Sequence, residues 1–140
     1  MNLRKYYPIA ESVAQLSKDP RTKVGALIID ERGCIRAVGY NGFPRGIDDY
    51  PERYADRLIK LRLVAHAEAN AIANAAAVGT PLEGCSLVVT KYPCHDCAKL
   101  IINAGIERIL TSEAEPGSWI DSSLTASWMF DEAGIKVEIV

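Results

Sequence analysis

Two short segments of the chain combine an imidazole with two thiols. His66 lies in the sequence His-Ala-Glu, and Cys94 and Cys97 lie in the sequence Pro-Cys-His-Asp-Cys. All three are good zinc ligands. Three protein ligands leave one position of a tetrahedral zinc ion open, as in catalytic sites, whereas structural sites usually have four. The residue types and their spacing therefore predict a catalytic zinc site formed by His66, Cys94 and Cys97.

Glu68, two residues after His66, is the predicted proton carrier of this site. From the first turn of a helix, its carboxylate can reach past the metal toward the open coordination position. There it can accept a proton from zinc-bound water, whose pKa the metal lowers toward about 7. The combination of His-x-Glu with Pro-Cys-x-x-Cys is similar to the signature of zinc-dependent nucleobase deaminases. A thioredoxin-like redox pair is the alternative for Cys-x-x-Cys alone, but such pairs lack the upstream His-x-Glu.

The four cysteines divide into two groups. The Cys94-x-x-Cys97 spacing places both thiols on the first turn of one helix, where unpaired N–H groups and the helix dipole favour the thiolate that binds metal. Cys34 and Cys85 lie in apolar runs that are predicted to be strands. We expect these two to be small buried side chains with no role as ligands.

The elements that position the site follow from the pattern of apolar, Gly and Pro residues. Residues 64–78 are rich in Ala and contain no Gly or Pro, which predicts a helix that starts beside His66. Pro93 near the start and Gly105 past the end predict a second helix that carries the two cysteines. The other predicted elements are a helix over 3–16, strands over 24–30, 34–41, 85–92, 106–112 and 136–140, a short helix near 52–60 and a helix ending near Gly134.

Composition and charge limit the class of protein. A chain of 140 residues is long enough for one domain with a substantial core. The 16 Lys and Arg against 18 Asp and Glu give a formal net charge of −2, which provides no general positive field for a nucleic-acid polymer. No segment approaches the roughly 20 apolar residues of a membrane span, and the N-terminal residues lack a secretory signal. We therefore expect a cytoplasmic protein without a membrane or nucleic-acid partner.

Most of the chain resembles the deoxycytidylate (dCMP) deaminase branch of the cytidine deaminase superfamily. The resemblance is carried by SKDPRTKVGA (17–26), GYNGFPRG (39–46), HAEANAI (66–72) and PCHDCAKLIINAGI (93–106). It implies hydrolysis of dCMP to dUMP and ammonia by a zinc-activated water, feeding dTMP synthesis. It also implies an α/β fold, the cytidine deaminase-like α/β/α sandwich, with a five-stranded mixed sheet and helices on both faces. Residues 1–140 would then be a single zinc-dependent deaminase domain, usually assembled in this family into homo-oligomers that are often hexamers.

The resemblance assigns further residues to the substrate. His66, Cys94 and Cys97 match the family's zinc ligands, and Glu68 matches its proton shuttle. The substrate residues are then Asn41, which matches an asparagine that hydrogen-bonds the sugar, and Ala67, whose backbone would contact the base. A turn residue and a helix-packing residue are the alternative explanations for these two positions.

In many family members the segment GYNGxPxG also helps to form a regulatory site for dCTP and dTTP, with magnesium. The matching residues of this chain are Gly42, Phe43, Pro44 and Gly46. The resemblance thus implies Mg²⁺ as a second ion, bound with a triphosphate effector, and allosteric control of the oligomer. Turn geometry alone also explains these residues, so the two interpretations stay open.

A mononucleotide substrate needs cations for its phosphate. Arg offers a bidentate fork and Lys a point charge. Among the basic residues on the loops expected around the site, Arg21 and Lys91 are the predicted phosphate ligands. The linker 47–63, the pair Lys91-Tyr92 and Trp119 differ from the better-known relatives, and we expect all three to border the substrate pocket.

Other functions fit the same residues. The first alternative is a deaminase of another free nucleoside, base or modified cytosine nucleotide. A tRNA deaminase would be expected to show a basic face with exposed aromatic residues, which the charge balance does not favour. The alternative outside enzymes is a zinc-bound nucleotide sensor that has lost turnover. Glu68 argues against the sensor, because a structural zinc site needs no such carboxylate.

Overall fold

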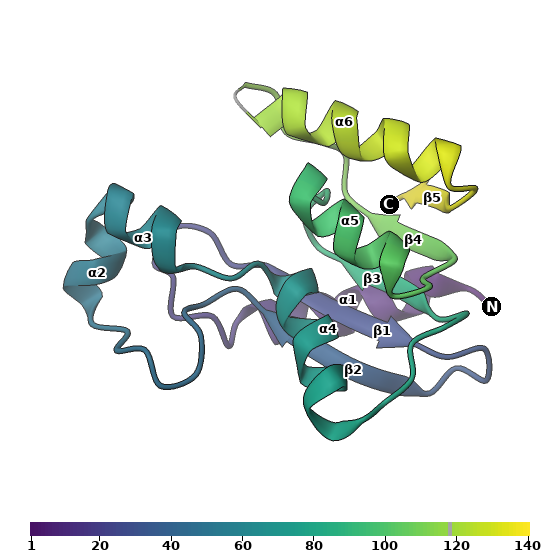
Figure 1. Cartoon of the computed structure of the whole chain (residues 1–140), viewed down its shortest axis with the longest axis horizontal. Coiled ribbons are helices and arrows are strands. Elements are labelled where there is room, and N and C mark those ends of the chain that lie inside the picture. Colours follow the sequence, from purple (N-terminus) through teal and green to yellow (C-terminus); the bar gives the residue numbers. More distant parts are fainter. Residues whose placement is uncertain (118) are drawn as a thin grey trace.

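The computed structural model describes residues 1–117 and 119–140, and its centre is one five-stranded sheet (Figure 1). The strand order is β2-β1-β3-β4-β5. Strand β1 runs antiparallel to both β2 and β3, and β3, β4 and β5 run parallel to one another. The strands are β1 (Gly25–Ile29), β2 (Ile35–Tyr40), β3 (Ser86–Val89), β4 (Arg108–Thr111) and β5 (Lys136–Ile139).

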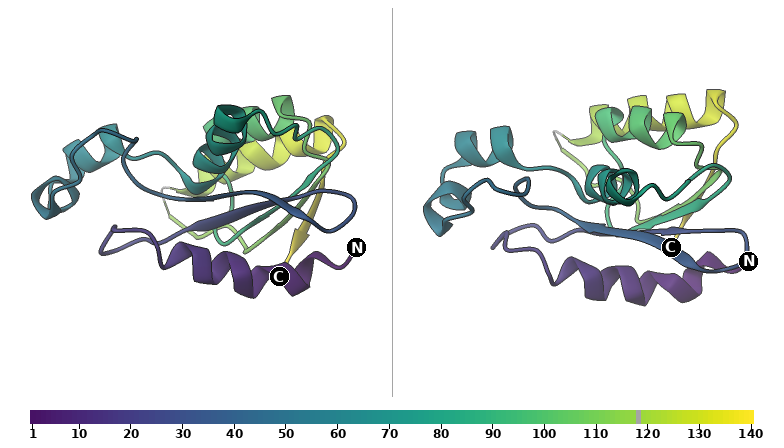
Figure 2. Two further views of the ribbon diagram at one scale, coloured as in Figure 1. Left: turned by 90° about the horizontal axis from the view of Figure 1, so that it is seen from below. Right: turned by 60° about the horizontal axis from the view of Figure 1, so that its bottom comes forward.

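Helices cover both faces of this sheet, as Figure 2 shows. The period-two alternation of β1 sends Leu27 and Ile29 to one face and Ala26 and Ile28 to the other. A single helix, α1, packs on the first face, and α4, α5 and α6 lie on the second. The predicted mixed α/β/α sandwich is therefore confirmed. The helices in the described residues are α1 (Tyr7–Ala14), α2 (Pro51–Ala55), α3 (Arg57–Leu63), α4 (Ala67–Val78), α5 (His95–Asn103) and α6 (Trp119–Glu132).

The N-terminal helix is shorter and less regular than its apolar pattern predicts. The chain forms a 3-10 turn over Leu3–Tyr6 and then α1, instead of one helix over 3–16. Helix α4 starts at Ala67 with His66 as its N-cap and ends at Val78, where it is capped by Gly79, whose φ of +73° suits glycine. No helix in residues 1–117 and 119–140 has both the length and the apolar character needed to cross a membrane.

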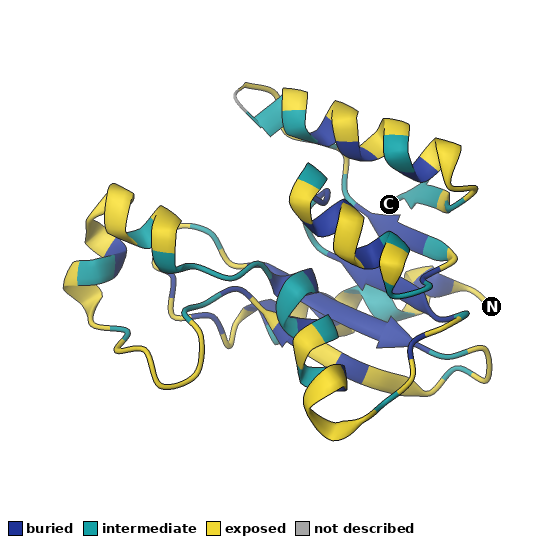
Figure 3. Ribbon diagram, viewed as in Figure 1, coloured by how far each residue is buried: buried dark blue, intermediate teal, exposed yellow. Residues whose placement is uncertain are grey.

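The linker after β2 forms two helices where a single short helix near 52–60 was predicted. Asp56 separates α2 from α3 because its backbone is extended (φ −84°, ψ 107°). Its carboxylate accepts hydrogen bonds from the backbone N–H groups of Leu58 and Ile59, at 3.1 Å each, and so caps the start of α3. The two helices form an arm that extends away from the sheet and is largely exposed (Figures 1 and 3).

The prediction for the two non-ligand cysteines is half right. Cys85 is buried at the start of β3, but Cys34 is exposed in the turn between β1 and β2. The apolar run after Cys34 is misleading because β2 is the edge strand of the sheet, with side chains that alternate between buried and exposed.

Two glycines allow helices to lie very close to the sheet. A Cβ atom on Gly39 in β2 would fall 2.3 Å from the carbonyl oxygen of Ala67 and 2.4 Å from the backbone nitrogen of Ala71. On the other face, a Cβ atom on Gly25 would fall 2.0 Å from the carbonyl oxygen of Ala10. The backbones of α4 and α1 thus occupy space that any other residue at these positions would need.

Candidate active site

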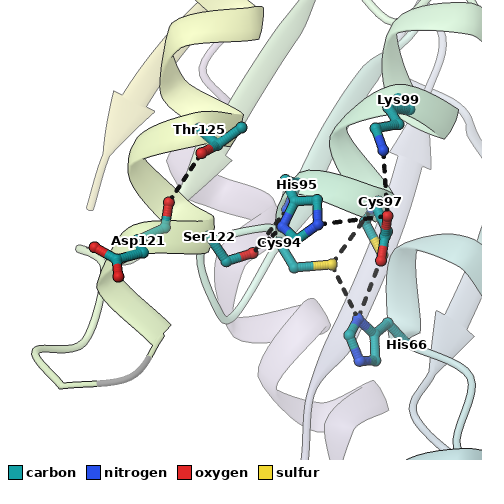
Figure 4. Close-up of polar contacts among 9 residues, drawn as sticks. His66, Cys94, His95, Cys97, Lys99, Asp121, Ser122 and Thr125 are labelled. Carbon is teal, nitrogen blue, oxygen red and sulfur yellow. Dashed lines mark hydrogen bonds and ion pairs between the residues drawn. The ribbon is translucent and has the colours of Figure 1, made fainter.

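The N-termini of α4 and α5 bring the three predicted ligands together (Figure 4). His66 is the N-cap of α4 and Cys94 is the N-cap of α5, with Cys97 on the first turn of α5. Nδ1 of His66 lies 3.4 Å from Sγ of Cys94 and 3.4 Å from Sγ of Cys97. All three donor atoms lie within 4.8 Å of one another.

The spacing of these donors fits zinc. Zinc–sulfur bonds of about 2.3 Å and zinc–nitrogen bonds of about 2.1 Å at a tetrahedral angle place nitrogen and sulfur roughly 3.6 Å apart. The hydrogen bond from the Cys97 thiol lowers the pKa of Cys94 to about 4, and the His66 ring adds to this effect. The same hydrogen bond to Cys94, together with burial, raises the pKa of Cys97. The cluster therefore holds a thiolate beside a second thiol that zinc would deprotonate on binding.

Glu68 lies on the first turn of α4, and its side chain is buried. Burial raises the pKa of its carboxyl group to about 7, against the opposing effects of its own backbone N–H and the neighbouring His66. Glu68 and His66 both line a cavity of about 130 Å³. The carboxyl group and the histidine of the metal cluster thus face the same cavity.

This cavity draws on distant parts of the chain. Its lining includes residues from the loop before β1, the end of β2, the arm, the start of α4 and the segments after β3 and before α6. The lining residues are Asp19, Thr22, Val24, Asn41, Lys60, Leu61, Val64, His66, Ala67, Glu68, Lys91, Tyr92 and Trp119. The linker 47–63, the pair Lys91-Tyr92 and Trp119 all contribute to it. The three divergent segments therefore line one cavity.

The predicted substrate residues do not all reach the cavity. Asn41, Ala67 and Lys91 line it, whereas Arg21 is exposed and is not among the lining residues. The amide of Asn41 is also tied to the loop before β1. Its Oδ1 accepts a hydrogen bond from the backbone N–H of Val24, and its Nδ2 donates one to the carbonyl of Thr22, both at 2.8 Å. Asn41 therefore fixes this loop in addition to facing the cavity.

Trp119 forms a wall of the cavity next to the metal cluster. Its indole N–H donates a hydrogen bond of 3.2 Å to the carbonyl of Tyr92. The ammonium nitrogen of Lys91 lies 4.3 Å from the centre of the indole ring, within the range of a cation–π contact. The indole and His66 rings are 5.9 Å apart. These contacts connect the start of α6 to the segment that precedes Cys94.

The four residues of the predicted effector segment lie outside this cavity, between β2 and α2. The ring of Phe43 stacks on Tyr54 of α2, with centroids 4.3 Å apart. Gly42 forms a short bridge with Ala65, in which each backbone N–H donates to the other residue's carbonyl. Pro44 and Gly46 are exposed. The segment thus connects the arm to the body of the protein.

Two features of the site were not predicted. The ammonium nitrogen of Lys60, on α3, lies 2.7 Å from Oδ2 of Asp19, and both residues line the cavity. No local signal in the sequence indicates that Lys60 turns inward, because Asp19 is the single acidic residue of a loop that also contains three basic residues.

The second feature is His95, which lies between the two cysteines and is half-buried. Its backbone N–H and its Nδ1 contact the hydroxyl of Ser122 on α6, at 3.0 and 2.7 Å (Figure 4).

The three-donor cluster and the cavity beside it have the ligand set of a catalytic zinc site. Residues 1–113 match the family described as the cytidine and deoxycytidylate deaminase zinc-binding region. The chain belongs to the cytidine and deoxycytidylate deaminase family.

Individual relatives cover nearly the whole chain. Human deoxycytidylate deaminase is 40% identical over 136 residues, covering 93% of this chain and 74% of its own length. An uncharacterized deaminase from the luxG 3′ region of Aliivibrio fischeri is 37% identical over 137 residues, covering 96% and 90%. The crystal structure of the dCMP deaminase from cyanophage S-TIM5, in complex with dCMP and dUMP, aligns with a TM-score of 0.78 and 28% identity, covering 98% and 95%.

Proposed function

We propose that this chain hydrolyses dCMP to dUMP and ammonia and so supplies dUMP for dTMP synthesis. The observation that carries the proposal is the cluster of His66, Cys94 and Cys97, whose histidine lines the same cavity as the buried Glu68 and two lysine side chains. The named activity of the human relative and the dCMP and dUMP in the cyanophage structure support this choice of substrate. The proposal treats residues 1–140 as one catalytic domain, and a cytoplasmic location stays a prediction.

The catalytic roles follow from the positions of the side chains. Zinc held by the imidazole and two thiolates would supply Lewis-acid activation of a water molecule. Glu68 is positioned to accept a proton from that water and to give it to the ring nitrogen of the base. As the water's oxygen bonds to the ring carbon, Glu68 would carry the remaining proton of that water to the amino group. The C–N bond then breaks, ammonia leaves, and the oxygen stays on the ring as the carbonyl of dUMP.

The remaining cavity residues would hold the nucleotide. The backbone of Ala67, at the start of α4, is placed to contact the base beside Glu68. The Asn41 amide keeps one N–H and one oxygen lone pair beyond its two backbone hydrogen bonds, and these are available for the sugar. Lys91 would supply positive charge for the phosphate. Arg21 would join it only if its exposed side chain turns toward the bound nucleotide.

Substrate preference provides the direct test. We expect a higher kcat/KM for dCMP than for deoxycytidine, because only the nucleotide has a phosphate for the lysines of the cavity. Ammonia release should be measured with a panel of nucleosides, bases and nucleotides, with and without a zinc chelator. Equal kcat/KM values for deoxycytidine and dCMP would favour the free-nucleoside alternative. Nucleotide binding without any ammonia release would favour the sensor.

The same assay assigns the phosphate ligands. Lys91→Met should raise KM for dCMP by about 10-fold or more and change deoxycytidine turnover little, because one charge-assisted hydrogen bond contributes about 1.5–3 kcal/mol. Arg21→Gln tests the second predicted ligand. Lys99→Met is the matched control, since Lys99 is an exposed lysine of α5 that does not line the cavity.

Regulation is a further part of the proposal. If Gly42, Phe43, Pro44 and Gly46 form an effector site in a homo-oligomer, dCTP with Mg²⁺ should activate the enzyme and dTTP with Mg²⁺ should inhibit it. Typical coupling of about 1–3 kcal/mol is enough to change a sigmoidal dCMP curve into a nearly hyperbolic one. Initial rates against dCMP with each triphosphate will show this. Unchanged curves would leave the segment with its structural contacts to the arm alone.

A further inference from the structure

An ion pair lies at the edge of the cavity where the arm meets the loop before β1. The carboxylate of Asp19 is almost fully buried, with 1% of its side chain exposed, and the side chain of Lys60 is 17% exposed. Oδ1 of Asp19 accepts hydrogen bonds from the backbone N–H groups of Arg21 and Thr22, at 2.9 and 3.2 Å. Oδ2 lies 2.7 Å from the Lys60 ammonium. Both carboxylate oxygens of Asp19 are thus in contact with polar groups of the protein itself.

The ammonium group of Lys60 is only partly used by this contact. An ammonium group has three N–H donors, and one of them suffices for Oδ2 of Asp19. The other two are available to the cavity that Lys60 lines. Both residues line the cavity, but Lys60 is the more accessible member of the pair, with 17% of its side chain exposed against 1% for Asp19.

The charge of the substrate phosphate favours a second cation in the cavity. A phosphate monoester carries about −1.5 to −2 charges near pH 7, more than one ammonium neutralises. Within the described residues, Lys60 and Lys91 are the two lysines of the cavity lining, and they come from α3 and from the segment after β3. A nucleotide that enters the cavity can therefore be held by cations from two separate elements.

We propose that Lys60 binds the phosphate of the nucleotide substrate and that Asp19 is the positioning residue that keeps its ammonium group in the cavity. This inference rests on the proposed function, since it requires a substrate with a phosphate. Holding a flexible lysine in place before the substrate arrives reduces the entropy lost on binding. The arm thereby becomes part of the substrate site.

A second ion pair separates this role from simple attachment of the arm. Lys18 Nζ lies 2.8 Å from Asp49 Oδ2, so this pair also joins the loop before β1 to the linker after β2. Its side chains are 68% and 42% exposed, and neither residue lines the cavity. Lys18→Met therefore removes an equivalent attachment without removing a cation from the cavity.

The experiment compares Lys60→Met with Lys18→Met in the full chain, with kcat/KM measured for dCMP and for deoxycytidine. We expect Lys60→Met to lower kcat/KM for dCMP by about 10- to 100-fold, mainly through KM, as for the loss of a charge-assisted hydrogen bond. Deoxycytidine turnover should stay within about twofold of wild type, and Lys60→Arg should restore most of the dCMP activity. Lys18→Met should resemble wild type with both substrates.

Other results would overturn the inference. An equal loss with both substrates would make Lys60 a structural residue of the arm, and no loss with either would remove it from the site. If Lys60→Met does not fold, Lys60→Gln removes the charge but keeps an N–H donor for Asp19, and the dissociation constants of dUMP and deoxyuridine give the same comparison. A wild-type enzyme without preference for dCMP would instead contradict the proposed function.

Discussion

Glu68→Gln is expected to bind zinc and nucleotide as the wild-type protein does and to lose nearly all turnover. Glutamine has nearly the shape of glutamate, so the buried first turn of α4 can accommodate it without a cavity. It cannot carry a proton, however. General acid–base groups typically contribute about 10²–10⁴-fold to the rate, and the proposed mechanism asks Glu68 to move more than one proton in each cycle. We therefore expect kcat to fall by about 10⁴-fold or more.

Three measurements make this result specific. Zinc content, the dissociation constant of dUMP and the melting temperature should all match the wild type, so that only kcat changes. Glu83→Gln is the matched control, because Glu83 is exposed and lies outside the cavity. A Glu68→Gln enzyme that retains more than a tenth of the wild-type kcat would remove Glu68 from the mechanism.

Cys97→Ala should lose both zinc and a large part of its stability. The cluster would hold zinc through three donors, and a ligand that binds only the folded state stabilises that state. A thousandfold weaker affinity removes about 4 kcal/mol of this stabilisation, or roughly 10 °C or more in Tm for a domain of this size. Metal analysis after dialysis and thermal unfolding with and without added zinc will measure the two losses, and Cys94→Ala should behave alike.

Cys85→Ala separates loss of a ligand from loss of a buried thiol. Cys85 is buried like Cys97 but lies at the start of β3, outside the three-donor cluster. It should keep about one zinc per chain and show the same zinc-dependent rise in Tm as the wild type. Wild-type zinc content in both Cys94→Ala and Cys97→Ala would contradict the ligand assignment.

The sequence predicts the metal cluster well because its signal is local. His66, Cys94 and Cys97 each lie within one turn of a helix start, and helix starts are marked by nearby Pro, Gly and Ala patterns. Apolar runs bounded by Gly and Pro likewise predict the five strands, whereas the mixed order of the sheet is what the family resemblance implies. The residue types thus specify both the ligands and the elements that carry them.

Contacts between distant segments were much harder to predict. Nothing in the local sequence shows that Lys60 meets Asp19, because the pairing depends on the path of the arm between β2 and α4. The sequence predicts one helix for the arm, but the structure has two. The break at Asp56 comes from its extended backbone, which is recognised in the structure together with the hydrogen bonds by which Asp56 caps α3. Arg21 illustrates the converse: a basic residue in a matching segment whose side chain does not line the cavity.

The missing side chain of Gly39 determines more than the packing of one helix. Ala67 and Ala71 approach β2 through the space that a Cβ atom would occupy, and His66 immediately precedes this contact. The thickness of the layer between α4 and the sheet thus sets how far the imidazole stands from the cysteines on α5. A chain could contain all three ligands and still hold the metal poorly if a bulkier residue at position 39 lifted α4 away from the sheet. Metal binding in this protein therefore depends on the lack of a side chain at Gly39 as well as on the imidazole and the two thiols.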